Sequence, residues 1–266
     1  MLSEVRNLLH GRFRSKWTRV RGGGPHSAHS PPLSLAQFAK PTFHALFVDA
    51  AGTLIYPSED TATVYSRYAQ PYGLTRTPEQ ILSSYRKAYA KPWAHSSIRY
   101  VDDGRPFWKF IVAESTGIDN EEMFEALYAY YSRKEAWTVA PGAREALREI
   151  RDELRIKTAV VSNFDRRLHD ILKELELVDL FDCVVVSADC GAEKPNPIIF
   201  TRACESLGVR PECVIHVGDD HRNDVKGARD AGCYAWLMGE GDDVTSWGDV
   251  VERLRTGNFI DSLSDP

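Results

Sequence analysis

The sequence predicts an α/β fold with a parallel sheet that is interrupted by an all-helical insert. From about residue 141 to residue 240, short apolar runs typical of buried strands alternate with amphipathic segments of helical periodicity. Such alternation indicates a parallel sheet covered by helices on both faces. A single apolar run, residues 44–48, lies before the insert and ends in Asp49. Between these parts, residues 57–139 have helical periodicity and carry most of the aromatic side chains.

The elements can be placed in order along the chain from these periodicities. The expected core strands cover residues 44–48, 158–161, 183–187, 214–217 and 234–238, and the expected core helices cover 142–154, 168–177, 197–207 and 225–231. The expected insert helices cover residues 58–72, 77–89, 107–114 and 120–136, and a last helix covers about 244–254. In the second insert helix, Pro78 stands at the first helical position, where its missing N–H does no harm.

Composition narrows the class of protein. The 266 residues are 43% hydrophobic and 27% charged, which is ordinary for a globular protein, and the net charge of -5 gives no reason to expect a nucleic-acid partner. No apolar run approaches the roughly 20 residues that span a bilayer, so no membrane partner is expected. Five cysteines without a CxxC pair indicate reduced thiols in an intracellular compartment. The sequence favours neither a monomer nor an oligomer.

The first 43 residues differ in charge from the remainder. Residues 1–44 contain seven Lys or Arg and one acid, Glu4, and the segment from Met1 to Arg21 places apolar residues near one helical face. Arg-rich, acid-poor, amphipathic starts are typical of organelle transit peptides. We therefore expect residues 1–43 to be a transit peptide for a mitochondrion or chloroplast, or else a disordered basic leader of a cytoplasmic protein.

Polar residues follow three of the expected strands, where ligands bind in parallel sheets. The strands end in Asp49, in Ser162 and Asn163, and in Asp219 and Asp220. A carboxylate at such a position can attack phosphorus, so Asp49 is the candidate nucleophile. A loop-capping role is its alternative.

A phosphorylated substrate would bring negative charge to this nucleophile, so cations are required. Mg²⁺ prefers hard oxygen ligands, which Asp219 and Asp224 can supply together with Asp49. Lys194 would neutralise charge on the phosphoryl group and on Asp49.

Two further groups would donate hydrogen bonds to the phosphoryl group, namely the Ser162 hydroxyl and the Asn163 backbone N–H. The alternatives are a helix N-cap for Ser162 and a solvated surface position for Lys194. We expect Asp220 to lie behind the metal ligands or at the surface, and His221 to lie at the rim.

Four signatures occur in a fixed order, and their combination is far more specific than any one of them. They are Phe47-Val48-Asp49-Ala50-Ala51-Gly52-Thr53-Leu54, Val160-Val161-Ser162-Asn163, Glu193-Lys194-Pro195-Asn196-Pro197 and Val217-Gly218-Asp219-Asp220-His221-Arg222-Asn223-Asp224. This set resembles the four motifs of the haloacid dehalogenase superfamily.

The resemblance implies a Rossmann-like core, residues 44–56 and 140–240, with a helical cap domain at 57–139. The expected C-terminal helix and tail, residues 241–266, lie outside the part that the resemblance covers. The resemblance also implies that the backbone carbonyl of Ala51 is a metal ligand. The segments Glu135-Ala136-Trp137, Pro141 to Leu147 and Val161 to Leu168 are most similar to the family named haloacid dehalogenase-like hydrolase domain-containing protein 3.

One position departs from the phosphatases of that superfamily. They carry Asp-x-Asp in the first motif, and the second Asp moves protons, whereas this chain has Ala51. General acid–base catalysis contributes about 10²- to 10⁴-fold, so we expect a slow phosphatase that needs good leaving groups. The alternative is a catalytically silent binding or regulatory protein.

Two other branches of the superfamily lack that Asp. The metal-free haloacid dehalogenases are disfavoured because Asp219 and Asp224 remain. The phosphonoacetaldehyde hydrolases share Asp-x-Ala-Gly-Thr and need a cap lysine, for which Lys87 and Lys91 are candidates, although surface lysines are common on such helices.

For the substrate pocket, Trp93, Arg105, Phe107 and Trp108 are candidates, with core packing as the alternative for the aromatic residues.

Overall fold

The centre of the computed structural model, which describes residues 43–93, 96 and 98–257, is a five-stranded parallel sheet. Its order is β5–β4–β1–β6–β7. The strands are β1 (Ala45–Val48), β4 (Lys157–Ser162), β5 (Cys183–Val186), β6 (Val214–Gly218) and β7 (Tyr234–Leu237). The expected parallel α/β fold is confirmed, and each predicted core strand is present to within one residue at either end.

The chain changes direction in the sheet at β1. After β1 it adds β4 and β5 on one side, and it then crosses to add β6 and β7 on the other. Val48 is in register with both Val160 and Val217, so Asp49, Ser162 and Asp219 follow at nearly the same level of the sheet. This strand-order switch is the place where parallel sheets bind ligands.

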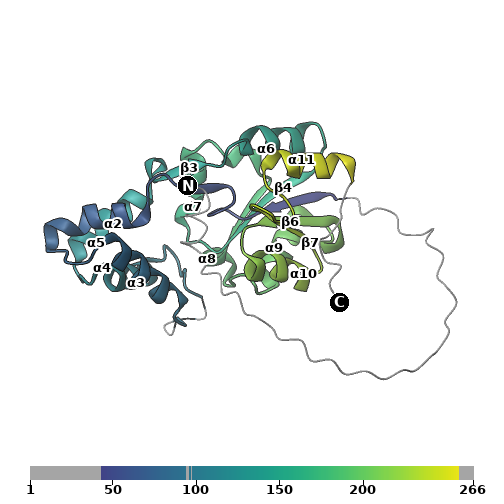
Figure 1. Cartoon of the computed structure of the whole chain (residues 1–266). Coiled ribbons are helices and arrows are strands. Elements are labelled where there is room, and N and C mark those ends of the chain that lie inside the picture. The colour runs from purple at the N-terminus through teal and green to yellow at the C-terminus, as the bar shows by residue number, and fades with distance from the viewer. Residues whose placement is uncertain (1–42, 94–95, 97, 258–266) are drawn as a thin grey trace, which may run out of the picture.

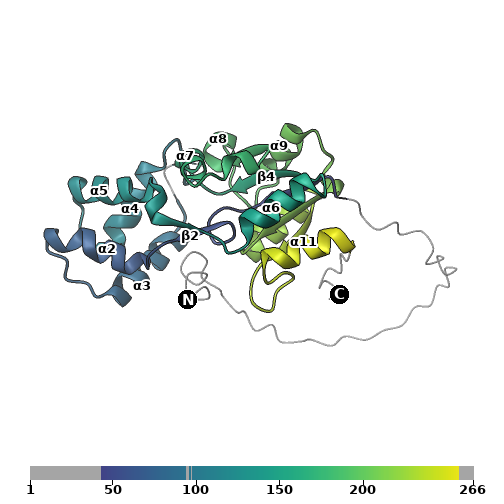
Figure 2. The same cartoon turned by 90° about the horizontal axis from the view of Figure 1, so that it is seen from above.

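Helices cover both faces of the sheet (Figure 2). They are α6 (Ala143–Asp152), α7 (Arg167–Glu174), α8 (Ser187–Cys190), α9 (Ile198–Leu207), α10 (Gly227–Asp230) and α11 (Trp247–Thr256). Because side chains alternate along a strand, Leu46 and Val48 point to the face covered by α6, α7 and α11, and Ala45 and Phe47 to the face covered by α9 and α10.

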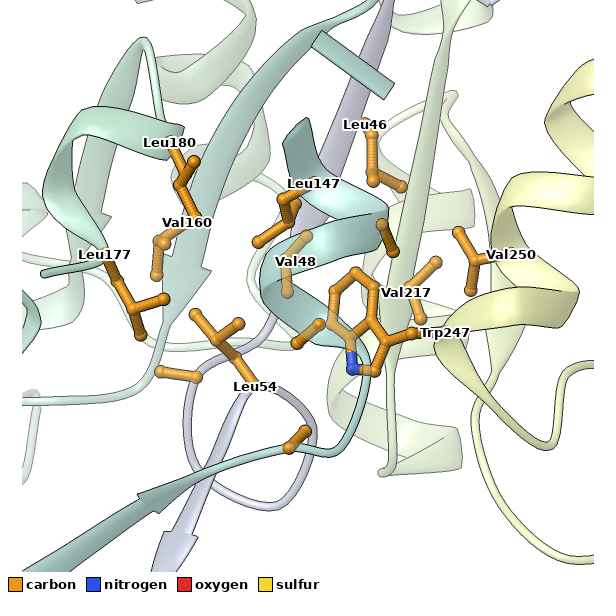
Figure 3. Packing of buried hydrophobic residues seen from close by; sticks show 14 of the residues in the cluster. Leu46, Val48, Leu54, Leu147, Val160, Leu177, Leu180, Val217, Trp247 and Val250 are labelled. Carbon is orange, nitrogen blue, oxygen red and sulfur yellow. The ribbon is translucent and has the colours of Figure 1, made fainter. Parts of the chain in front are cut away.

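Figure 3 shows the first of these faces, where Leu46 and Val48 of β1 lie among Leu147 of α6 and Trp247 of α11. These side chains are buried, and each fully buried residue of this size contributes roughly 1.5–3 kcal/mol of hydrophobic stabilisation. The sheet edge that presents Asp49 is therefore held on a rigid core.

The segment between β1 and β4 forms a separate bundle, the helical insert, at one end of the molecule (Figure 1). It contains α2 (Thr61–Ala69), α3 (Pro78–Ala90), α4 (Arg105–Thr116) and α5 (Glu121–Tyr131), with a short 3₁₀ turn at Gln70–Tyr72. Thr77 and Gln80 form a reciprocal capping box at the start of α3. The insert has its own apolar core, in which Tyr65, Ile81 and Phe107 are buried.

Two boundaries of the insert differ from those predicted. Helix α5 ends at Tyr131 rather than at residue 136, and a 3₁₀ turn, Lys134–Ala136, follows. The insert is joined to the core by a two-stranded antiparallel ribbon of β2 (Ile55–Pro57) and β3 (Trp137–Val139), which was not predicted. Its strands are three residues long and about 80 residues apart in sequence, so neither produces a recognisable local pattern.

The end of β6 also differs. A helix was expected from residue 225, but the chain forms a π-helical turn at His221–Lys226 before α10. The wider turn begins where the Asp220 carboxylate accepts a hydrogen bond from the Asn223 N–H, at 2.6 Å. Asp224 therefore lies on this π-helical turn and not on a regular helix, and its side chain is buried.

The core includes one residue that was assigned to the leader. Phe43, which we assigned to the leader, is buried and packs against Tyr234 and Trp236 of β7. The predicted transit peptide otherwise lies outside the described residues, as do residues 258–266 of the predicted tail. Within the described part of the chain, every helix is too short or too polar to cross a membrane.

Candidate active site

Three carboxylates meet at the strand-order switch. Asp49 follows β1, Asp219 follows β6 and Asp224 lies on the π-helical turn, and all three are buried. One oxygen from each lies within 4.8 Å of the others. The sequence predicted this set, and the structure brings it together.

Two glycines let the carboxylates approach the backbone. A Cβ at Gly52, where φ is +94°, would lie 2.7 Å from the Asp219 carboxylate, and a Cβ at Gly218 would lie 2.1 Å from the Asp224 carboxyl carbon. Side chains at these positions would collide with the cluster. The glycines of the first and last motifs are therefore needed for its geometry.

The Lys194 side chain bridges two of the three carboxylates. Its Nζ donates to Asp49 Oδ1 at 2.7 Å and to Asp224 Oδ1 at 2.6 Å, and the side chain is buried. A surface position for Lys194 is thus wrong. The Asn163 side chain holds the Lys194 backbone, accepting from its N–H at 2.6 Å and donating to its carbonyl at 2.9 Å. This positioning by the Asn163 amide was not predicted.

His216 is a site residue that the sequence did not reveal. It lies within β6, is fully buried, and its Nε2 is 2.9 Å from Asp224 Oδ1. Burial lowers the pKa of His216, although the bond to Asp224 opposes this, so the imidazole is neutral and donates from Nε2. The only sequence signal was a histidine in an apolar strand two residues from Gly218.

The charges of the cluster support one another. Burial alone would lower the pKa of Lys194, but Asp224 and Asp49 outweigh it and raise that pKa above its usual value. Burial would likewise raise the pKa of Asp224, but Lys194 and the His216 hydrogen bond hold it below the usual range. Both groups are therefore ionised at neutral pH.

The cluster fits a divalent cation. Three carboxylates and one ammonium leave two negative charges, which such an ion would balance. Asp224 Oδ2 accepts only the Asp220 N–H among the hydrogen bonds of the described residues, so a lone pair remains for a ligand bond. Oxygen donors of this kind suit Mg²⁺.

Of the remaining predicted site residues, Ser162, Ala51 and Asp220 line a cavity, and His221 does not. Ser162 is buried at the end of β4 and lines a cavity between the core and the helical insert. It does not cap α7, which begins at Arg167. Ala51 lines the same cavity beside Asp49. Asp220 caps the π-helical turn and also lines the cavity, whereas His221 is exposed outside it.

The carboxylate cluster opens into a cavity between the core and the helical insert. Its empty space is about 1050 Å³, including the part that is open to solvent. We call the core side its floor, formed by Asp49, Ala51, Ser162, Asn163, Lys194, Asp220, Asn223 and Asp224. We call the insert side its roof, formed by Thr61, Tyr65, Tyr85, Tyr89, Arg99, Tyr100, Trp108, Val112, Phe124, Leu127, Tyr128 and Tyr131. Pro57, Trp137, Phe164 and Arg167 complete the wall.

Of the four predicted pocket residues, Trp108 alone lines the cavity. Trp93 and Phe107 pack in the insert, with ring centroids 5.3 Å apart. Arg105 pairs with Asp103 and Glu125. The aromatic alternative, core packing, is therefore correct for two of the three aromatic candidates.

The first turn of α4 and the loop before it join the insert to the core at two places. The Trp108 indole N–H donates to the buried Asp165 carboxylate at 2.9 Å, and Arg166 pairs with Asp102 at 3.0 Å. The second contact lies beside Lys194, where Glu193 accepts from the Arg99 backbone N–H and approaches its guanidinium to 3.7 Å. These contacts hold the roof over the floor.

The chain belongs to the haloacid dehalogenase-like hydrolase family, whose model matches residues 43–232. It is 32% identical over 200 residues to haloacid dehalogenase-like hydrolase domain-containing protein 3 of Xenopus laevis, covering 71% of this chain and 82% of that protein.

Solved structures share the fold. A haloacid dehalogenase superfamily phosphatase from Thermococcus onnurineus superposes with a TM-score of 0.60 at 24% identity, over 80% of this chain and 98% of that one. The L-2-haloacid dehalogenase of Xanthobacter autotrophicus gives 0.64 at 22% identity, over 81% and 99%. At these identities the likeness concerns the fold alone.

Proposed function

We propose that this protein is a Mg²⁺-dependent hydrolase of phosphorylated small molecules that forms an aspartyl intermediate on Asp49. The observation that supports the proposal best is the Lys194 ammonium between Asp49 and Asp224. An anionic nucleophile can approach an anionic phosphoryl group only where such charge is already in place. A solely structural carboxylate cluster would not need to open into a cavity.

The carboxylate cluster and most residues of the floor have a role in the proposal. Asp49 attacks phosphorus with the carboxylate oxygen that does not bind Lys194, and Lys194 stabilises charge on the phosphoryl oxygens. Ser162 donates its hydroxyl, and the Asn163 backbone N–H donates beside it, while the Asn163 side chain keeps Lys194 in position. Asp49, Asp219, Asp224 and the Ala51 carbonyl would hold Mg²⁺, which supplies positive charge that draws electron density from the phosphoryl group.

Ala51 determines the rate in this proposal. A methyl group can neither protonate a leaving group nor activate water, so both half-reactions proceed without that assistance. The loss is about 10²- to 10⁴-fold for leaving groups that need a proton. The expected activity is therefore slow and confined to esters or anhydrides whose leaving group departs as a stable anion.

Ala51 also favours a second candidate, a silent binding or regulatory protein that retains the phosphate site. The two differ in turnover but share binding. In the presence of Mg²⁺, beryllium fluoride should raise the melting temperature of wild type in both cases, because it mimics a phosphoryl group on Asp49. Only the hydrolase also releases phosphate.

A phosphonoacetaldehyde hydrolase receives no support from the cavity. Lys87 of α3 and Lys91, which follows the helix, are exposed, and Lys91 pairs with Glu114 at 2.5 Å. Among the described residues that line the cavity, Lys194 is the one lysine, and it belongs to the floor. A Schiff base from the roof would need a lysine there.

The test of the proposed function is phosphate release by the full chain with Mg²⁺ from an aryl phosphate, an acyl phosphate and several sugar phosphates, with phosphonoacetaldehyde as a further substrate. Asp49→Asn is the blank, because it keeps the shape and removes the nucleophile. Turnover of wild type above this blank supports the proposal. Equal release by the two proteins would reject catalysis at Asp49 and favour the binding role.

A further inference from the structure

We propose that the substrate of this site is a phosphate monoester with a flat aromatic leaving group, an aryl phosphate. The inference rests on the proposed function and adds the chemistry of the group that occupies the roof. It is carried by the shape and composition of the cavity wall opposite Asp49.

Six aromatic rings form a continuous arc around the cavity. In order they are Tyr89, Tyr85, Tyr65, Tyr131, Trp137 and Phe164, and all six line it. Neighbouring ring centroids lie 5.9, 6.0, 6.3, 6.1 and 5.8 Å apart. We call these residues the aromatic arc. It begins in α3 of the insert and ends in the core, two residues after Ser162.

The rings of the aromatic arc line a cavity and are not enclosed in a core on every side. Rings buried only for stability pack against one another on all sides, whereas these present surface to a cavity that also contains Asp49 and Lys194. Aromatic side chains favour edge-to-face or offset contact with another ring, worth more than burial alone. A planar aromatic group would find such contacts at several points of the arc.

The roof offers few charged groups to a sugar or another polar leaving group. Among its described residues, Arg99 carries the one permanent charge, and this arginine approaches Glu193 and lies 5.0 Å from the Tyr89 ring. Tyr89 and Tyr100 hydrogen-bond to each other.

One more phenol of the roof is already engaged. The Tyr128 hydroxyl donates to the Asp103 carbonyl at 2.6 Å. Burial raises the pKa of Tyr65 and of Tyr85, so these phenols stay neutral. Neutral phenols keep their O–H donors, so the roof can meet a few polar groups, but most of its surface is aromatic ring.

The floor leads to the same leaving group by separate reasoning. Because Ala51 cannot give a proton, the departing oxygen must bear its negative charge. A phenoxide delocalises that charge into its ring, whereas an alkoxide cannot. The aromatic roof and the missing proton donor therefore select one class of ester.

The reaction balances without another reactant. An Asp49 oxygen forms a bond to phosphorus as the bond between phosphorus and the aryl oxygen breaks, and the electron pair leaves on the phenoxide. The phenoxide takes a proton from water. Water then cleaves the acyl phosphate, giving inorganic phosphate and the Asp49 carboxylate, and its proton passes to the phosphate or to solvent.

The experiment measures binding, so its result does not depend on turnover. Phenylphosphonate and methylphosphonate share the anionic head and are not hydrolysed, and only the first has a ring. Their dissociation constants are measured calorimetrically with the full chain and Mg²⁺. We expect phenylphosphonate to bind at least about tenfold more tightly to wild type.

Two residues of α2 give a matched comparison. Tyr65 belongs to the aromatic arc, whereas Tyr68, one turn further on, packs against Tyr130 outside the cavity. Tyr65→Leu should reduce the preference for phenylphosphonate several-fold and Tyr68→Leu should preserve it. Tyr65→Phe, which keeps the ring in place, should also preserve it and covers the case in which Tyr65→Leu does not fold.

A ratio near one in wild type would overturn the aryl substrate, even if the protein hydrolyses other phosphates. Equal ratios in folded Tyr65→Leu and Tyr68→Leu would also overturn it. If the tenfold preference holds but phenyl phosphate is not hydrolysed, the aromatic site stands and catalysis at Asp49 fails.

Discussion

The floor and the roof of the cavity differ in kind. On the floor, Lys194 pairs with Asp49 and Asp224 in a buried network, with His216 bound to Asp224 and the Asp219 carboxylate beside them. On the roof, neutral aromatic rings predominate. A charged network fixes where one chemical group must sit, whereas an aromatic wall selects the shape of the remaining molecule. The same floor can thus serve different substrates as the roof changes.

The largest expected effect is a gain on the floor. Ala51→Asp restores a group that can move a proton, at a position already open to the cavity. Phosphate release from an alkyl phosphate should rise about 10²- to 10⁴-fold in kcat/KM. A nitrophenyl phosphate, whose leaving group needs no proton, is the control and should gain much less. No gain in a folded variant would show that more than a proton donor is missing.

The second effect concerns stability. Lys194→Met leaves Asp49 and Asp224 buried without their shared cation. Losing one partner of a buried ion pair costs roughly 3–5 kcal/mol, so the free energy of unfolding without Mg²⁺ should fall by about that amount. Lys226→Met is the control, since Lys226 pairs with Asp230 at the surface and should change stability by under about 1 kcal/mol. Similar losses in both variants would contradict the buried network.

The third effect is the acid dependence of that network. The folded pKa of Asp224 lies below the 3.8 of the unfolded chain, so the folded state binds fewer protons between these values. Its contribution is complete above about pH 4 and is lost as the pH falls toward the folded value. Urea melts of the metal-free protein across this range should show a steeper acid loss for wild type than for Asp224→Asn. Parallel curves would contradict the depressed pKa.

A fourth, smaller effect separates neighbouring carboxylates. Asp219→Asn removes one of three clustered charges, and the midpoint concentration of Mg²⁺ for activity or for thermal stabilisation should rise at least about tenfold. The matched variant Asp220→Asn changes the next residue, which caps the π-helical turn, and should shift the Mg²⁺ midpoint far less. A larger shift for Asp220→Asn would move the metal away from Asp219.

The smallest effect tests how the roof is attached. Trp108→Phe keeps an aromatic ring at this position of the roof but removes the hydrogen bond to Asp165. The free energy of unfolding should fall by about 1 kcal/mol, because Arg167 still binds the Asp165 carboxylate. Hydrogen exchange of residues 98–104 should become faster. Unchanged exchange would mean that the roof is held without this bond.

The floor could be predicted from the sequence and the roof could not. Asp49, Ser162 and Asp219 each follow an apolar strand, and the carboxyl ends of parallel strands meet at one edge, so local patterns place them together. His216 was missed because a histidine in an apolar strand shows no partner until Asp224 folds beneath it. The ring orientations of Tyr65 and Tyr85 depend on how α2 and α3 pack, which periodicity does not specify.

The connection between the two regions was also hidden. The β2–β3 ribbon joins residues about 80 positions apart, and the contact of Arg99 with Glu193 joins others 94 apart. Long-range pairing of this kind follows from tertiary packing and has no local signature. The helices of the insert were nevertheless predicted well, because capping at Thr77 and apolar periodicity are local properties.

The central claim, that Asp49 becomes phosphorylated, can be tested by rapid mixing with an aryl phosphate and Mg²⁺, acid quenching and peptide mass spectrometry. Because no group at position 51 activates water, the intermediate should accumulate. We predict a mass increase of one phosphoryl group on Asp49 in wild type, with less accumulation in Ala51→Asp. Phosphate release without modification of Asp49, or modification of another residue, would contradict the account.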